Sequence, residues 1–218
     1  MRAYRGLLTA EETARCNRFA LPRGRHECLV TRALVRTLLS QYTGADPRDW
    51  RFALGAYGRP EIERPTAFRG LRFNVSHTRG RIVCLLARDI DIGVDVEDSD
   101  RRVRFLSIAH RYFSADEAEA LRAVPESQRR RRFFDYWTLK ESYIKARGMG
   151  LALPLGQFSF VWDDSGPVRI IFQAGLADDA AEWQFGKLAL TTRHPVAIAV
   201  RRGRAPDLRL VVREASRV

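Results

Sequence analysis

A helix followed by two short strands occurs twice in this 218-residue chain, and the repeat constrains the fold more than any other feature. In the first copy, apolar residues at helical spacing over residues 29–40 precede a strand-like segment at 50–54. In the second copy, a helix ending near Ala146 precedes a strand-like segment at 158–162. The matching positions are Gly58 and Gly166, Ile62 and Ile170, 71–73 and 183–185, and 82–88 and 196–202.

The repeat predicts an α+β fold of two similar subdomains, each a helix packed on a small antiparallel sheet. The strand connections are too short for parallel crossovers. We expect the boundary in the polar stretch 98–104, which gives an N-terminal half, 1–98, and a C-terminal half, 99–218, that carries the second helix. Such a pseudo-dimer has a cleft between its halves, a common place for a ligand.

Composition excludes several classes of protein. The longest apolar runs, Ile82–Ala87 and Val196–Val200, are too short to span a membrane. The first twenty residues are charged throughout and have no apolar core, so we expect no secretory signal and a cytoplasmic location. The cysteines, Cys16, Cys28 and Cys84, lack metal-ligand spacing and are interpreted as small core residues in a reducing cytosol.

The chain is strongly basic, with a net charge of +12. This charge indicates a polyanionic partner or, alternatively, an arginine-rich solvated surface. Only three of the 38 basic residues are lysines, Lys140, Lys145 and Lys187. Two of them lie five residues apart, which points to positions where an ammonium is required rather than a guanidinium.

The segment 90–97 alternates strictly between aliphatic and small or acidic residues, which predicts a strand. A half-exposed edge strand would explain the pattern without any function. However, acidic residues are disfavoured in strands, and Asp95 and Glu97 would lie about 6–7 Å apart on one face. A divalent cation would remove their repulsion, and oxygen ligands suit magnesium.

The segment 133–145 predicts a helix that ends at Gly148. Ser114 and Glu117 form a capping-box pattern, which predicts the start of an earlier helix. Phe133, Trp137, Glu141 and Lys145 share one stripe of the helix at 133–145. A surface Glu–Lys pair is one interpretation, and charges that face a cleft and a bound phosphate are the other. Lys140 is offset from Glu141 by about 100°, so we expect it at the rim of the cleft or facing a partner protein.

A third segment, 73–78, ends in Ser76, His77 and Thr78, which offer hydrogen-bond donors to an anion. A packed or capping histidine is the alternative. The chain contains no glycine-rich phosphate loop, nucleophile elbow or dinucleotide fingerprint. Phosphate binding would therefore depend on side chains.

Together these segments resemble the 4′-phosphopantetheinyl transferases of the long, pseudo-dimeric Sfp type. Each motif is weak alone, whereas the ordered set through most of the chain is specific. The set comprises Gly58-Arg59-Pro60, Phe73-Asn74-Val75-Ser76-His77, Ile92–Glu97, Tyr112-Phe113-Ser114 with Glu117, and Trp137–Lys145 with Gly148, Gly150 and Leu151.

The resemblance implies Mg²⁺-dependent transfer of 4′-phosphopantetheine from coenzyme A to a serine of an apo acyl or peptidyl carrier protein, with release of adenosine 3′,5′-bisphosphate. The family's magnesium ligands match Asp95, Glu97 and Glu141, and Glu141 also matches the proposed base. Residues that contact coenzyme A, its phosphates and pyrophosphate match Arg15, Arg59, Ser76, His77 and Lys145. Glu12 stands where a second basic residue for the 3′-phosphate would fall.

The family docks its carrier on the segment that matches 101–121. Here Phe105, Ile108, Tyr112 and Phe113 could form an apolar anchor or simply close the core. A magnesium-dependent phosphodiesterase or nuclease is the alternative function, since it would use the same types of residue. A nucleic-acid-binding module would need arginines clustered on one element, whereas here they are spread over the chain. We therefore expect a monomer that binds neither nucleic acid nor membrane.

Overall fold

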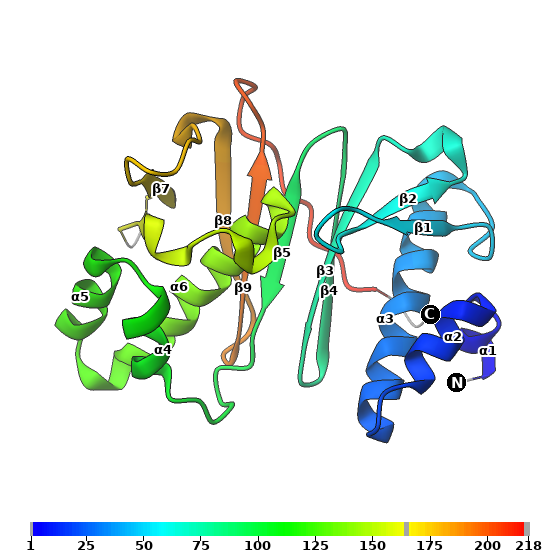
Figure 1. The fold of residues 1–218 in the computed structure, drawn as a ribbon, viewed down its shortest axis with the longest axis horizontal. Helices are drawn as coiled ribbons and strands as arrows, with labels where there is room; N and C mark the ends of the chain where they lie inside the picture. Colours follow the sequence, from blue (N-terminus) through cyan, green and yellow to red (C-terminus); the bar gives the residue numbers. More distant parts are fainter. Residues whose placement is uncertain (1, 164–165, 216–218) are drawn as a thin grey trace. The chain divides into compact units, whose positions relative to one another are not determined.

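The computed structural model describes residues 2–163 and 166–215, and it combines helices with small sheets (Figure 1). The predicted α+β class is confirmed. The chain forms two compact units: unit 1 contains residues up to 54, 60–71 and those from 209 onward, and unit 2 contains 55–59 and 72–208. The division into halves at residue 98 stays a prediction. No helix among the described residues is long and apolar enough to cross a membrane.

Unit 1 is built on the long helix α3, which has Pro22 in its first turn and ends at Gly44 in the left-handed conformation (φ 78°). Its strands β1 and β2 pair antiparallel, and Trp50 is fully buried. The elements of unit 1 are α1 (Arg2–Arg5), α2 (Ala10–Asn17), α3 (Pro22–Thr43), β1 (Arg51–Leu54), β2 (Pro60–Arg64) and the short 3-10 helix η1 (Thr66–Phe68).

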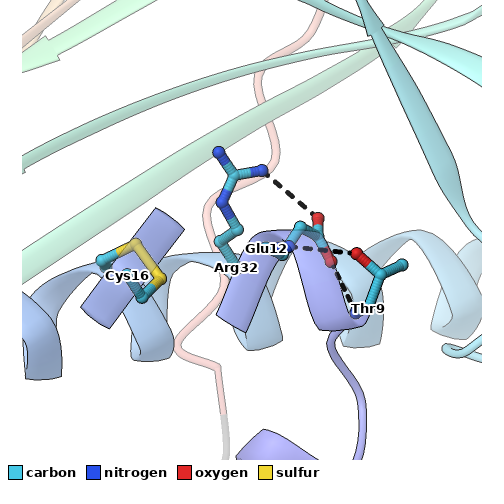
Figure 2. The surroundings of a disulfide bond; sticks show 5 residues. Thr9, Glu12, Cys16 and Arg32 are labelled. Atoms are coloured by element: carbon cyan, nitrogen blue, oxygen red, sulfur yellow. Dashed lines mark hydrogen bonds and ion pairs between the residues drawn. A yellow bond between two sulfur atoms is a disulfide. The ribbon is translucent and has the colours of Figure 1, made fainter. Parts of the chain in front are cut away.

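A disulfide joins Cys16 of α2 to Cys28 of α3, with their Cα atoms 5.5 Å apart (Figure 2). The interpretation of these two residues as free core thiols is therefore wrong. The two helices pack against each other and bring the cysteines together, which residue spacing alone does not reveal. Cys84 is a free thiol, and burial raises its pKa to about 12.

Unit 2 contains a three-stranded antiparallel sheet in the order β5-β9-β8, and the pairs β3-β4 and β6-β7. Its strands are β3 (Leu71–Thr78), whose first residue belongs to unit 1, β4 (Arg81–Arg88), β5 (Ile92–Val96), β6 (Phe158–Val161), β7 (Arg169–Phe172), β8 (Trp183–Thr191) and β9 (His194–Arg201). Its helices are α4 (Phe105–Tyr112), α5 (Ala115–Ala123), α6 (Glu126–Arg147), η2 (Gly150–Ala152), η3 (Leu155–Gln157) and η4 (Ala180–Glu182).

Helix α6 lies across the β5-β9-β8 sheet (Figure 1) and supplies much of the core of unit 2. All five residues of β5 are buried, so the half-exposed edge strand considered above is not observed. Gly93 permits the close approach of α6 to β5, because an added Cβ would lie 2.0 Å from the carbonyl oxygen of Ser142. The helix axis can therefore come near the strand that carries Asp95.

The repeated pattern is present in the backbone. Helix α3 and helix α6 both have 22 residues and end at a left-handed glycine, Gly44 and Gly148. Each is followed by an antiparallel pair, β1-β2 or β6-β7. The predicted end of the second helix and the predicted cap of Ser114 and Glu117 on α5 are confirmed.

Candidate active site

Asp95, on β5, is the centre of a buried polar group. Its Oδ1 accepts hydrogen bonds from Ser76 Oγ at 2.7 Å and from Lys145 Nζ at 2.6 Å. Lys145 Nζ also donates to Ser76 Oγ at 3.0 Å and to the Val94 carbonyl oxygen at 3.2 Å. The structure thus brings together three side chains from β3, β5 and α6 that are distant in the sequence.

Two local features hold these elements in place. The side-chain oxygen of Asn74 on β3 accepts a hydrogen bond from the Val94 amide at 2.8 Å, which ties β3 to β5 beside Asp95. Gly93 allows α6 to lie against β5, as described above. The neighbours of Asp95 in sequence therefore determine which side chains of β3 and α6 reach it.

Glu97 directly follows β5, and its Oε1 accepts hydrogen bonds from Trp137 Nε1 at 3.1 Å and from Arg101 at 3.0 Å. Burial and the negative charge of Asp95 raise the pKa of Glu97 to about 7, against the opposing charge of Arg101. The pKa of Glu141 is also raised, first by burial and then by the charge of Asp95. Burial and the charge of Asp95 therefore disfavour ionisation of both Glu97 and Glu141.

The donor atoms of this group suit a divalent cation. Asp95 Oδ2 is buried and has no hydrogen-bond partner, an arrangement that is costly unless another group compensates it. Carboxylate oxygens are the ligands that Mg²⁺ prefers. As the side chains stand, no group of three or more His, Cys, Asp or Glu residues in the described part of the chain is arranged to hold a metal ion. The suitability of this group for Mg²⁺ therefore rests on the unpartnered Oδ2 of Asp95 and on the presence of carboxylate donors.

His77 and Arg59 are also in unit 2. His77 is exposed, whereas its neighbour Ser76 is buried, because consecutive side chains of a strand point to opposite faces. His77 is therefore not a packed core histidine. Arg59 donates a hydrogen bond to the Ala146 carbonyl oxygen at 2.9 Å and lies 3.6 Å from Asp91, which places it at the C-terminal end of α6.

Arg15 is exposed on α2, in unit 1. Glu12, which stands where the resemblance expected a second basic residue, has a structural role. It completes the N-terminal cap of α2 with Thr9, and its carboxylate pairs with Arg36 at 2.6 Å and with Arg32 at 3.3 Å. Figure 2 shows the cap and the contact with Arg32 beside the disulfide.

The predicted position of Lys140 is wrong. Its side chain is fully buried and forms an ion pair with Glu117 at 2.7 Å. It also donates to the carbonyl oxygens of Leu155 and Phe158, both at 2.7 Å. Because α6 is covered on most of its circumference, a residue turned away from the Glu141 stripe points into the core and not toward a rim.

The apolar residues considered as a carrier anchor belong to the core. Phe113 is buried, and Phe105, Ile108 and Tyr112 pack partly buried against the same cluster. The large apolar residue that α4 exposes is Leu106, with 49% of its surface accessible. Phe113 therefore closes the core, and a role of the partly exposed Phe105, Ile108 and Tyr112 in carrier docking stays a prediction.

Sequence reasoning missed the contacts that orient Glu97. The sequence places Trp137 on the helical stripe and Arg101 in a polar segment, and neither position indicates a contact with Glu97. One feature of the sequence indicates that Trp137 lies near the site: it shares a helical stripe with Glu141 and Lys145. Nothing in the sequence connected Asn74 with Val94, because that bond depends on how β3 lies beside β5.

Comparison with known proteins gives a consistent result over nearly the whole chain. The profile of the 4′-phosphopantetheinyl transferase superfamily matches residues 91–199, and the profile described as 4′-phosphopantetheinyl transferase, N-terminal, matches residues 2–90. The 4′-phosphopantetheinyl transferase HetI of Nostoc sp. is 37% identical over 66% of this chain, and the aligned part spans 61% of that relative.

A 4′-phosphopantetheinyl transferase of Bacillus subtilis is 34% identical over 86% of this chain and 83% of its own length. A solved holo-(acyl-carrier-protein) synthase from Bacillus anthracis str. Ames is 21% identical. It covers 51% of this chain and 95% of its own, with a TM-score of 0.41.

Proposed function

Because the chain belongs to the 4′-phosphopantetheinyl transferase superfamily, we propose that the site around Asp95 transfers 4′-phosphopantetheine from coenzyme A to a serine of an apo acyl or peptidyl carrier protein. The chain is similar to the Sfp type within this superfamily. The observation that carries the proposal is the meeting of Ser76, Asp95 and Lys145 beside two further carboxyl groups. The alternative of a phosphodiesterase or nuclease finds no support in the comparisons.

In the proposed reaction, the serine oxygen of the carrier forms a bond with the phosphorus that bears the pantetheine arm. The bond from this phosphorus to the bridging oxygen breaks, and adenosine 3′,5′-bisphosphate leaves with that oxygen. Glu141 accepts the serine proton, a role that its raised pKa favours over that of an ordinary carboxylate near neutral pH. Lys145 neutralises charge on the pyrophosphate.

Asp95, Glu97 and Glu141 would hold Mg²⁺. The bound ion supplies Lewis-acid stabilisation of the pyrophosphate charge. The chain's own contribution is to keep the carboxyl groups together. Trp137 and Arg101 fix Glu97, and Asn74 fixes the strand that carries Asp95.

Coenzyme A is the proposed co-substrate, with Arg15, Arg59 and His77 as contacts to its phosphates. His77 is exposed and free to turn toward a ligand, and Arg59 presents its guanidinium at the end of α6. The net charge of +12 suits both coenzyme A and carrier proteins, which are typically acidic. We propose a cytoplasmic monomer that acts on neither nucleic acid nor membranes.

The test is to incubate the full chain with coenzyme A, Mg²⁺ and an apo carrier and to follow the carrier by mass spectrometry. We expect addition of one phosphopantetheine group, and none when EDTA is added or the carrier serine is replaced by alanine. Absence of the addition on several unrelated carriers would contradict the proposed function.

A further inference from the structure

Ser76 has already committed its hydroxyl proton. A serine has a single O–H donor, and that of Ser76 is directed at Asp95 Oδ1 at 2.7 Å. The same oxygen accepts a hydrogen bond from Lys145 at 3.0 Å, and the residue is only 6% exposed. In this arrangement Ser76 cannot also donate to a phosphate, whereas the adjacent and exposed His77 can.

The two oxygens of Asp95 are in different environments. Oδ1 receives the hydrogen bonds from Ser76 and Lys145, while Oδ2 is buried without a partner. A partial rotation of the carboxylate about its Cβ–Cγ bond would break both of these bonds. Ser76 and Lys145 therefore hold the carboxylate in one orientation, with Oδ2 available to another ligand.

We propose that Ser76 is a positioning residue that acts through Asp95 and controls the affinity of the site for a divalent cation, whereas His77 acts on coenzyme A. This inference rests on the proposed function, because it assigns the Asp95 site to a cation. It differs from the role that the resemblance gives to Ser76, which is contact with a coenzyme A phosphate. It also assigns two adjacent residues of β3 to different ligands, Ser76 to the cation and His77 to coenzyme A.

The first measurement needs no catalysis. Binding of Mn²⁺ to the full chain is followed by electron paramagnetic resonance for the wild type, Ser76→Val and Ser76→Thr. The two substitutions have similar volume, and only threonine keeps a hydroxyl. We expect Ser76→Val to raise the dissociation constant for Mn²⁺ at least about tenfold and Ser76→Thr to remain within about threefold of the wild type.

The second measurement separates the two substrates. At saturating Mg²⁺, Ser76→Val should leave the KM for coenzyme A within about threefold of the wild type, while His77→Ala should raise this KM and leave Mn²⁺ binding unchanged. Circular dichroism and thermal unfolding identify variants that do not fold, and Ser76→Ala replaces Ser76→Val if the latter is among them. A raised KM for coenzyme A with unchanged Mn²⁺ binding in the hydroxyl-free variant would overturn the inference.

The outcome is distinguishable from failure of the proposed function. If the wild type modifies no carrier but the Mn²⁺ affinities follow the expected order, the transfer proposal fails and the role of Ser76 in cation binding stands. If the wild type modifies carriers and the three proteins bind Mn²⁺ equally, the transfer proposal stands and the role of Ser76 fails.

Discussion

Two ion pairs on helix α6 lie five residues apart and differ in how completely their polar atoms are paired and in how far their lysines are exposed. In both, the lysine ammonium has three acceptors. Lys140 contacts Glu117 and two backbone carbonyl oxygens, and Lys145 contacts Asp95, Ser76 and one carbonyl oxygen. The carboxylates differ. Glu117 accepts hydrogen bonds at both oxygens, whereas Asp95 has a buried oxygen without a partner.

This difference separates a structural pair from the pair that we propose to be functional. Burial lowers the pKa of Lys140 and raises that of Glu117, and their mutual attraction opposes both shifts. Since all their polar atoms are satisfied, the pair stabilises the core and leaves nothing for a ligand. In the Asp95–Lys145 pair, Asp95 Oδ2 has no hydrogen-bond partner. Lys145 is 26% exposed, so a ligand can reach its ammonium group. Within this matched comparison, the unpartnered Oδ2 distinguishes the Asp95 pair from the Glu117 pair.

We expect the largest effect from a substitution that breaks the Lys140–Glu117 ion pair. Lys140→Met removes the partner of the buried Glu117 carboxylate and should lower the free energy of unfolding by about 3–5 kcal/mol. Lys145→Met serves as the matched control and should cost less stability, since Lys145 is 26% exposed whereas Lys140 is fully buried. Urea unfolding of both variants measures the difference. Equal losses of stability would show that the two pairs do not differ as proposed.

The second prediction concerns the functional pair. Lys145→Arg replaces a compact ammonium by a wide, planar fork, which cannot keep all three contacts of Lys145 Nζ. We expect kcat to fall at least about tenfold, which corresponds to about 1.4 kcal/mol of transition-state stabilisation. Carrier modification under saturating substrates measures kcat. A fully active variant would show that any cation suffices there.

The third prediction uses the raised pKa of Glu97, about 7. The protonated carboxyl group cannot serve as an anionic cation ligand, so activity at limiting Mg²⁺ should fall as the pH drops from 8 to 6. The ionised fraction decreases about tenfold over this range for a pKa near 7. Excess Mg²⁺ should shift the profile to lower pH, because cation binding favours the ionised form. A pH–activity profile that does not depend on Mg²⁺ concentration would show that Glu97 is not a ligand of the cation.

The comparison also shows what could be predicted from the sequence. The α+β class, the strands, the cap at Ser114 and the helix end at Gly148 depend on local patterns, and the structure agrees with them. The capping pattern predicts that Glu117 caps the N-terminus of α5, but not that it also forms an ion pair. Its ion pair with Lys140 depends on how α5 packs against α6, which periodicity does not encode. The same holds for the disulfide between α2 and α3.

The smallest expected effect concerns the orientation of Glu97. Trp137→Phe keeps an aromatic ring stacked near Phe133 but removes the indole N–H that donates to Glu97. Arg101 still contacts the same oxygen, so the loss should be about 0.5–1 kcal/mol, less than is usual for a hydrogen bond to a charged group. We therefore expect the Mg²⁺ concentration for half-maximal activity to rise about two- to fivefold, with kcat at saturating Mg²⁺ unchanged.

Tyr112→Phe is the matched control for this prediction, because Tyr112 packs edge-on against Trp137 and the substitution leaves the hydrogen bond to Glu97 in place. Its Mg²⁺ requirement should equal that of the wild type. If Trp137→Phe changes the KM for coenzyme A but not the Mg²⁺ requirement, the indole serves co-substrate binding. The distinction between the two ion pairs of α6 would then concern Lys145 alone and not the carboxyl groups around it.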